Sequence, residues 1–285
     1  MIKLKNKYLT AKIDEKGCQI ASLKEGEKEY IWQKDPEIWN SCGPVLFPFC
    51  GGLKDDKFIY EGVEYPSLRH GFAKTKEFDV KLLSRSSVTL SLVSDEETLK
   101  IYPFDFELNV TFTLLKKQMI VKYWVKNTGN KDMYFSIGSH EAYACEGGVE
   151  NYDVIFQKKE TLESVVVVDG LLSDEKKPII KSSRVLPIYE WHFDDDSLVF
   201  KDMASRKLIL RNRITGDRIG LDFPGADYFV IWHIKGAPYI CLEPWAGIGD
   251  GHGFQGEISE REGIITLKKN RTYCKVHKIS VLPTY

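Results

Sequence analysis

Two histidines lie beside glycines, in the segments Arg69-His70-Gly71-Phe72 and Gly138-Ser139-His140-Glu141-Ala142-Tyr143. Imidazole has an unperturbed pKa of about 6.5, so either ring could donate or accept a proton near neutral pH. A loop histidine that only hydrogen-bonds a carbonyl is the competing interpretation for both. The other four histidines lack such a setting and are expected to be structural; they are His192, His233, His252 and His277.

A third candidate is Glu243, which follows the strand-forming run 238–242 and precedes Pro244-Trp245. Burial against the indole of Trp245 would raise the pKa of this carboxyl group from about 4.3 towards the working range of a general base. A solvent-facing glutamate at a strand end is the competing interpretation. Trp245 could be a platform on which a sugar stacks or an ordinary core residue.

Neither a metal nor a nucleotide cofactor is expected. The sequence contains no H-x-H or H-E-x-x-H motif and no closely spaced cysteine pair. The glycine-dense segment 247–251 follows Pro244-Trp245, so it is interpreted as a loop and not as a dinucleotide-binding turn. Six scattered cysteines are expected to be reduced and to act as small apolar residues; they are Cys18, Cys42, Cys50, Cys145, Cys241 and Cys274.

Charge and hydropathy narrow the possible partners. Forty lysine and arginine residues against 41 aspartate and glutamate residues give a formal net charge of −1, with neither sign gathered into a block. That composition lacks the basic surface that nucleic acids require. The first ten residues have no apolar signal-peptide region, and the longest aliphatic run, 165–168, is too short to span a bilayer. We therefore expect a cytoplasmic protein with no nucleic acid or membrane as partner.

The elements that must hold these side chains are predicted to be strands. Short segments with alternating apolar residues are separated by turns, as in the two predicted hairpins 8–23 and 57–65. The segments 106–115, 119–127 and 133–138 predict a three-stranded meander. Only 35–40, with Pro36 near its start, suggests a short helix. Roughly fifteen to twenty strands without intervening helices predict an all-β, antiparallel two-sheet sandwich, and no linker divides residues 1–285 into domains.

Four segments in this order resemble the aldose 1-epimerase (galactose mutarotase-like) family, in particular its compact bacterial branch, over essentially the whole chain. They are Gly43-Pro44-Val45-Leu46-Phe47-Pro48, Arg69-His70-Gly71-Phe72, the segment from Gly138 to Tyr143, and Cys241-Leu242-Glu243-Pro244-Trp245. The resemblance implies a β-supersandwich fold, no cofactor and a shallow sugar cleft lined from several strands.

The resemblance also implies roles for individual residues. His140 corresponds to the catalytic acid, Glu243 to the catalytic base, and His70 to a second histidine that contacts the sugar near its ring oxygen. An aspartate on the sugar hydroxyls is expected in the segment 193–200, and Asp196 is our choice there over its neighbours Asp194 and Asp195.

The chain departs from the family pattern at two positions. Many relatives have arginine where this chain has Gly52, and arginine after His-Gly-Phe-x where it has Lys74. Arginine can clamp a hydroxyl pair or a phosphate with two hydrogen bonds, whereas lysine acts only as a point charge and glycine cannot act at all. Lys74 and Trp245 complete the predicted substrate-binding residues.

These residues predict an enzyme that interconverts the α and β anomers of a hexose or hexose phosphate. A carboxylate base and an imidazolium acid suffice to open and close the hemiacetal, and the rate should follow a bell in pH, with an acidic limb from the carboxylate. The alternative is a non-catalytic carbohydrate-binding or regulatory protein on the same fold. Glycoside hydrolysis would need two carboxylates, and the prominence of His140 argues against it.

Overall fold

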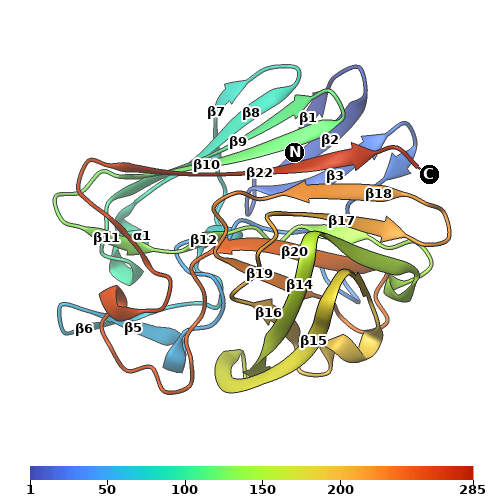
Figure 1. Cartoon of the computed structure of the whole chain (residues 1–285). Coiled ribbons are helices and arrows are strands. Elements are labelled where there is room, and N and C mark those ends of the chain that lie inside the picture. Colours follow the sequence, from blue (N-terminus) through green and yellow to red (C-terminus); the bar gives the residue numbers. More distant parts are fainter. Residues whose placement is uncertain (285) are drawn as a thin grey trace.

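The computed structural model describes residues 1–284, which form a nearly all-β molecule (Figure 1). The predicted all-β fold with antiparallel sheets is confirmed. The few helical segments are α1 (Glu96–Ile101) and the short 3₁₀ turns η1 (Lys54–Asp56), η2 (Ala73–Thr75), η3 (Val149–Asn151), η4 (Glu190–Phe193) and η5 (Ile258–Glu260). No helix in residues 1–284 is both long enough and apolar enough to cross a membrane.

Three small sheets flank the main one. The first joins four strands in chain order, β1 (Ile2–Lys5), β2 (Leu9–Asp14), β3 (Gln19–Glu25) and β4 (Lys28–Glu29). The second is the hairpin of β5 (Lys57–Tyr60) and β6 (Val63–Pro66), and the third pairs β11 (Met133–Phe135) with β21 (Ile265–Leu267). The pairings of β2 with β3 and of β5 with β6 confirm the two predicted hairpins.

The main sheet contains fourteen strands. They are β7 (Asp79–Leu83), β8 (Ser87–Val93), β9 (Phe106–Leu115), β10 (Gln118–Asn127), β12 (Ile137–Gly138), β13 (Ala142–Ala144), β14 (Tyr152–Val168), β15 (Leu171–Pro187), β16 (Ser197–Phe200), β17 (Lys207–Asn212), β18 (Arg218–Asp222), β19 (Tyr228–Trp232), β20 (Tyr239–Ala246) and β22 (Thr272–Leu282). The order is β12-β20-β19-β16-β14-β17-β18-β22-β10-β9-β8-β7, with β13 also on β20 and β15 on β14.

Alternation along the strands explains why the sheet forms two layers. In β9 the side chains of Phe106, Leu108, Val110, Phe112 and Leu114 are buried while those between them are more exposed. Apolar residues of β9, β10 and β22 share one continuous core with those of β19 and β20, so the two ends of the curved sheet face each other (Figure 1). The sandwich expected from the sequence is thus formed largely by one strongly curved sheet.

The predicted meander is correct for two of its three strands. β9 and β10 pair throughout, but β11 pairs with β21 and not with β10. The free edge of β10 is taken by β22, which pairs with it over nine residues and excludes the 133–135 segment. A pairing with a strand more than 130 residues away leaves no local signal in the sequence.

The predicted helix at 35–40 is wrong. Asp35 and Trp39 form an isolated antiparallel bridge, with hydrogen bonds in both directions between their backbones. The Asp35 carboxylate accepts a hydrogen bond from the Glu37 N–H at 2.9 Å, which favours a turn over a helix. The turn lets the Trp39 ring lie against the rings of Trp232 and Tyr239.

Candidate active site

β20 is the central strand of the candidate site and is buried along its whole length. Side chains alternate between the two faces of a strand, so Cys241, Glu243 and Trp245 project from the same face. β12 and β13 pair with β20 at Gly138 opposite Trp245 and at Ala142 opposite Cys241. The three residues between these strands, 139–141, therefore pass Glu243, and this register brings His140 to it.

The His140 ring lies directly beside the Glu243 carboxylate. The distance between His140 Nδ1 and Glu243 Oε1 is 3.3 Å, although the two atoms are not aligned as a hydrogen bond. Only 1% of Glu243 and 9% of His140 is exposed. Trp245 Nε1 donates to Glu243 Oε2 at 3.2 Å, and also to the Ser139 carbonyl at 3.2 Å. The indole therefore ties the two sequence segments together and holds the carboxylate.

Burial shifts the pKa values of this pair in opposite directions. Loss of water raises the pKa of the Glu243 carboxyl well above its usual range, against the smaller opposing effect of the Trp245 hydrogen bond. Loss of water also lowers the pKa of His140, to about 4. Both shifts favour the uncharged forms, so the resting pair holds its proton on Glu243 and His140 is neutral.

His70 lies across from His140, with 5.4 Å between the ring centres. Its Nδ1 accepts a hydrogen bond from the Gly51 N–H at 3.1 Å. Burial and the neighbouring positive charges hold the pKa of His70 well below its usual range, so the ring is neutral. With Nδ1 accepting, the proton of the neutral ring is on Nε2, which is left as a hydrogen-bond donor.

Asp196 is set apart from its two aspartate neighbours. Asp194 pairs with Lys235 and Asp195 with Lys177, both at the exposed surface. Asp196 has a backbone φ of +81° and pairs through Oδ2 with Arg69 Nη2 at 3.0 Å. Its Oδ1 is buried and has no hydrogen-bond partner. Asp196 is therefore the member of the run with a buried acceptor oxygen that has no partner.

Two tryptophans and one arginine near the pair were not predicted as site residues. Trp39 and Trp232 lie against the His140 ring, with centre-to-centre distances of 5.2 and 5.4 Å. Arg69 is next to His70 in sequence and affects the pKa values of both His140 and Glu243. The sequence could have indicated Arg69 through its place in the Arg-His-Gly-Phe segment. Trp39 and Trp232 reach the site only through tertiary packing.

A cleft of about 430 Å³ opens onto this site, and His140, His70 and Lys74 are among its lining residues. Lys74 is partly buried in η2, four residues after His70. Burial, and the nearby positive charge of Arg69, lower the pKa of Lys74. The predicted residues His70, Lys74 and His140 therefore share one cleft, while Glu243 and Trp245 lie behind His140 with almost no exposed surface.

Gly52 lies under the tip of the long hairpin formed by β14 and β15. A Cβ atom at Gly52 would stand 2.6 Å from the carbonyl oxygen of Gly170, in the turn between these strands. Leu172, just after that turn, donates its N–H to the Asp250 carbonyl at 2.8 Å, and Asp250 donates its own to the Gly52 carbonyl at 2.9 Å. The hairpin tip occupies the space into which any side chain at position 52 would extend.

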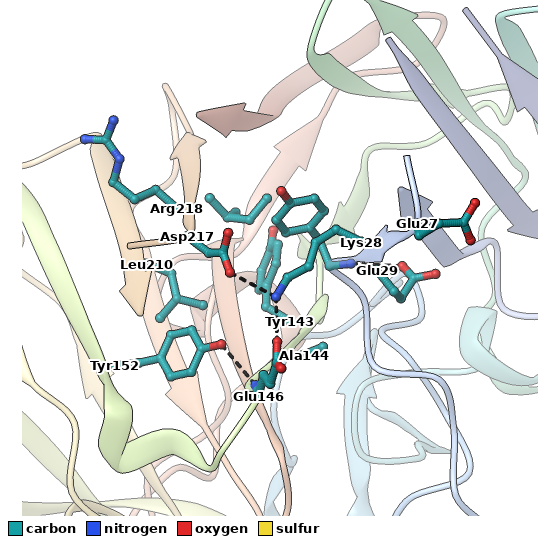
Figure 2. A pocket seen from close by; sticks show the side chains of 12 residues that line it. Glu27, Lys28, Glu29, Tyr143, Ala144, Glu146, Tyr152, Leu210, Asp217 and Arg218 are labelled. Carbon is teal, nitrogen blue, oxygen red and sulfur yellow. Dashed lines mark hydrogen bonds and ion pairs between the residues drawn. The ribbon is translucent and has the colours of Figure 1, made fainter. Parts of the chain in front are cut away.

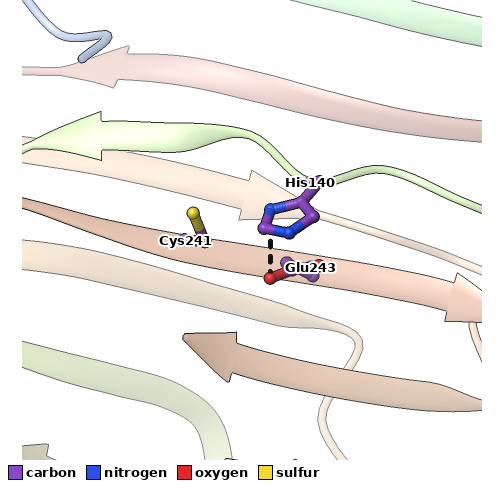
Figure 3. A group of neighbouring side chains, drawn as sticks. All are labelled: His140, Cys241 and Glu243. Carbon is purple, nitrogen blue, oxygen red and sulfur yellow. Dashed lines mark ion pairs between the residues drawn. The ribbon is translucent and has the colours of Figure 1, made fainter. Parts of the chain in front are cut away.

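His140, Cys241 and Glu243 could also be considered as metal ligands (Figure 3). One donor atom from each lies within 4.8 Å of the others, and all three side chains are buried. The 3.3 Å between His140 Nδ1 and Glu243 Oε1 suits two ligands of one tetrahedral ion. Two of the three donors come from alternate residues of one strand and the third from a distant loop, a grouping that motif spacing does not reveal.

Three of the remaining four histidines are buried, as a structural role requires, namely His192, His233 and His277, whereas His252 is not. His233 is buried between the Tyr239 carbonyl at 2.8 Å and Glu190 at 3.0 Å, and His277 is buried 3.0 Å from Glu141. His192 Nδ1 accepts from the Tyr189 N–H at 3.1 Å. His252 lies at the surface.

A second hollow, of about 270 Å³, lies between β4, β13 and β18 (Figure 2). Its central group is the Lys28 ammonium, which is 2.7 Å from Glu146 and 2.9 Å from Asp217. Two carboxylates therefore neutralise this lysine. Nothing in this hollow matches the coupled acid and base beside the first cleft, so it is a weaker candidate for catalysis.

Comparison with known proteins agrees over nearly the full chain. The model of the aldose 1-epimerase family matches residues 1–235. Protein LacX of Lactococcus lactis subsp. lactis, from a plasmid, is 34% identical over 99% of both chains. A galactose mutarotase related enzyme of Lactobacillus acidophilus superposes with a TM-score of 0.92 at 28% identity, covering 99% of this chain and 97% of the other. A galactose mutarotase-like protein of Lactobacillus casei gives 0.93 at 28% identity, covering 99% and 100%.

Proposed function

The chain belongs to the aldose 1-epimerase family, and on this premise we propose that it is a mutarotase. It interconverts the α and β anomers of a hexose or hexose phosphate by opening and closing the sugar ring. The observation that carries the proposal is the buried pair of His140 and Glu243, which are 3.3 Å apart and of which His140 lines the cleft. One group of this pair can give a proton while the other takes one, which is what ring opening requires.

The pair reaches its working state by an internal proton transfer. At rest Glu243 is protonated and His140 is neutral, because burial disfavours both charges. Transfer of the Glu243 proton to His140 Nδ1 creates a carboxylate beside an imidazolium without changing the total number of protons. The hydroxyls of a bound sugar stabilise this charged state by hydrogen bonding. The imidazolium then offers the proton on its other ring nitrogen to the substrate.

Ring opening moves two protons at once. The Glu243 carboxylate removes the proton from the C1 hydroxyl, and the imidazolium of His140 protonates the ring oxygen. The bond between C1 and the ring oxygen breaks as the C1 carbonyl forms. Rotation about C1–C2 presents the other face of the aldehyde, and the ring closes with both protons moving back. Each group contributes about 100- to 10,000-fold acceleration, which suffices for a reaction that already proceeds slowly in water.

The neighbouring residues orient the sugar. His70 donates from Nε2 towards the ring oxygen, since its Nδ1 is engaged by the Gly51 N–H. Asp196 accepts from a sugar hydroxyl through its unpartnered Oδ1, while Arg69 holds the other oxygen. Trp245 is 5% exposed and bonded to Glu243, so we assign it the positioning of the carboxylate and not sugar stacking.

The test is anomer exchange measured by NMR on free glucose, galactose and their 6-phosphates. Acceleration of at least one of them at catalytic enzyme concentration is expected. Binding without acceleration would contradict the proposal and favour a carbohydrate-binding or regulatory protein. Release of a reducing end from a glycoside would favour a hydrolase.

The proposed reaction uses no metal. Dialysis against a chelator should leave the exchange rate unchanged, whereas added Zn²⁺ should slow it, because an ion held by His140, Cys241 and Glu243 would occupy the atoms that exchange protons. Loss of activity on chelation, with recovery on adding zinc, would contradict this part of the proposal.

A further inference from the structure

Positive charge gathers in the cleft although the protein as a whole is almost neutral. The formal net charge of the chain is −1. Three lysines line the cleft beside His70 and His140, namely Lys16, Lys34 and Lys74, against the single carboxylate of Asp14. The local excess of positive charge is therefore a property of this cleft and not of the surface in general.

Only one of the three lysines has its charge balanced. Lys34 Nζ lies 2.8 Å from the Asp14 carboxylate. Within residues 1–284, neither Lys16 nor Lys74 makes an ion pair or a side-chain hydrogen bond through its ammonium group. Two unpartnered ammonium groups thus face the same space, one exposed and one partly buried.

Of these two lysines, Lys74 gives the stronger indication that the cleft binds an anion. A partly buried ammonium group loses hydration, and that loss is uncompensated unless an anion approaches. No carboxylate of residues 1–284 pairs with it, and Arg69 nearby adds like charge. The charge of Lys74 is therefore not balanced by any carboxylate of the described residues, in a cleft that also contains the two histidines of the proposed reaction.

Resting on the proposed function, the geometry points to a phosphorylated aldose as the substrate, with its phosphate held by Lys74 and Lys16 while its anomeric carbon lies at His140. A phosphate monoester is close to a dianion near neutral pH, so it matches two unpartnered ammonium groups. Lysine contacts phosphate as a point charge, so no forked geometry is needed. A sugar carboxylate shares the anionic chemistry but carries a single charge.

The part of the cleft lined by Lys16 and Lys74 favours a charged group of the substrate over further sugar hydroxyls. Neutral hydroxyls would leave the positive charges of Lys16 and Lys74 unbalanced, whereas an anion neutralises them. At the other side of the site, Gly52 has no side chain and the nearest cation is Arg69, whose Nη1 would stand 3.4 Å from a Cβ at Gly170 and whose charge is already paired with Asp196 at 3.0 Å. The phosphate is therefore placed on the Lys74 side.

The test compares kcat/KM for anomer exchange of galactose, glucose, their 6-phosphates and galacturonate. Wild-type protein should prefer the 6-phosphates over the parent sugars, and the preference should weaken as salt is added. In Lys74→Met the ratio of phosphorylated to neutral kcat/KM should fall roughly 10- to 100-fold, as expected for loss of a charged hydrogen bond. Lys74→Arg should restore much of the preference. Lys12→Met, on the exposed side of β2, is the matched control and should leave the ratio unchanged.

Equal kcat/KM for phosphorylated and neutral sugars in the wild type would overturn the inference and leave the mutarotase proposal standing. A preference for galacturonate over the 6-phosphates would also overturn it. If no sugar is exchanged, the proposed function fails, and calorimetry with a hexose 6-phosphate decides the remaining point. Binding that weakens in Lys74→Met but not in Lys12→Met would support the phosphate site, and absence of binding would overturn it.

Discussion

At the scale of single residues, the chemistry depends on where one proton resides. Glu243 and His140 both lose water on folding, and each is driven towards its neutral form. The pair then stores the proton on the carboxyl group and must transfer it before either residue can act in its assigned role. Asp196, which also raises the pKa of Glu243, and Arg69, which lowers it, lie near enough to adjust that balance.

We predict a bell-shaped dependence of kcat/KM on pH that reports the number of protons on the pair. Below the pKa of His140, about 4, the pair holds two protons, and above the raised pKa of Glu243 it holds none. Only the singly protonated pair is active. Burial therefore reverses the assignment of the two limbs that the sequence predicts: the acidic limb comes from the imidazole and the alkaline limb from the carboxyl group. An alkaline limb that survives in Glu243→Gln would contradict this assignment.

We also predict that Glu243→Gln stabilises the fold near neutral pH. The folded-state pKa of Glu243 is above its ordinary value of 4.5, so the folded state retains a proton that the unfolded state has lost. Burial of Glu243 therefore leaves the free energy of unfolding unchanged below pH 4.5. As the pH rises from there through the folded-state pKa, the free energy of unfolding falls. Glutamine removes this cost, and the free energy of unfolding should rise by about 1–3 kcal/mol near neutral pH.

Urea unfolding of both proteins at two pH values provides the measurement. The gain should shrink when the pH is lowered below the ordinary carboxyl pKa. Glu27→Gln is the matched control, because Glu27 is an exposed glutamate in the hollow of Figure 2 and has no ion pair within residues 1–284. A variant at Glu243 that is less stable than wild type at neutral pH would contradict the raised pKa.

The sequence could indicate the reacting residues but not all of their surroundings. His140 and Glu243 are about 100 positions apart, and they were paired through the resemblance of their motifs. Asp196 was chosen from three adjacent aspartates, and its pairing with Arg69 is consistent with that choice. Trp39 and Trp232 carry no motif, because side chains reach His140 from different strands only after the sheet curves.

At the scale of elements, the hairpin of β14 and β15 is the largest feature absent from the sequence-based prediction. Only its first residues, 152–156, were expected as a strand, whereas both arms run for seventeen residues. Lysines and glutamates interrupt the apolar alternation there, so the pattern is weak. The register also shifts at several points between the arms. Its tip reaches Gly52 and so borders the active site.

We predict that Gly52→Ala displaces the hairpin tip. The new Cβ would lie 2.6 Å from the Gly170 carbonyl, a distance that requires backbone movement. The variant should lose about 1–3 kcal/mol of stability, and the 169–170 turn should become more susceptible to limited proteolysis. Gly253→Ala is the control, because nothing lies within 4 Å of a Cβ there. Equal stability and protection of both variants would show that the tip does not press on Gly52.

At the scale of the whole molecule, apolar residues from Leu4 to Val281 belong to one continuous buried cluster. A core that joins both ends of the chain supports our proposal that residues 1–285 form a single domain. We predict one cooperative unfolding transition, with coincident curves from far-UV circular dichroism and tryptophan fluorescence. Two separated transitions would contradict the single domain.

The most direct test of the account is the anomer-exchange rate constant of Glu243→Gln on the best substrate found. Glutamine keeps the size of the side chain and its hydrogen bond from Trp245, but it cannot accept the C1 hydroxyl proton. We predict a fall of about 100-fold or more while sugar binding largely survives. Exchange at close to the wild-type rate would contradict the assignment of Glu243 as the base.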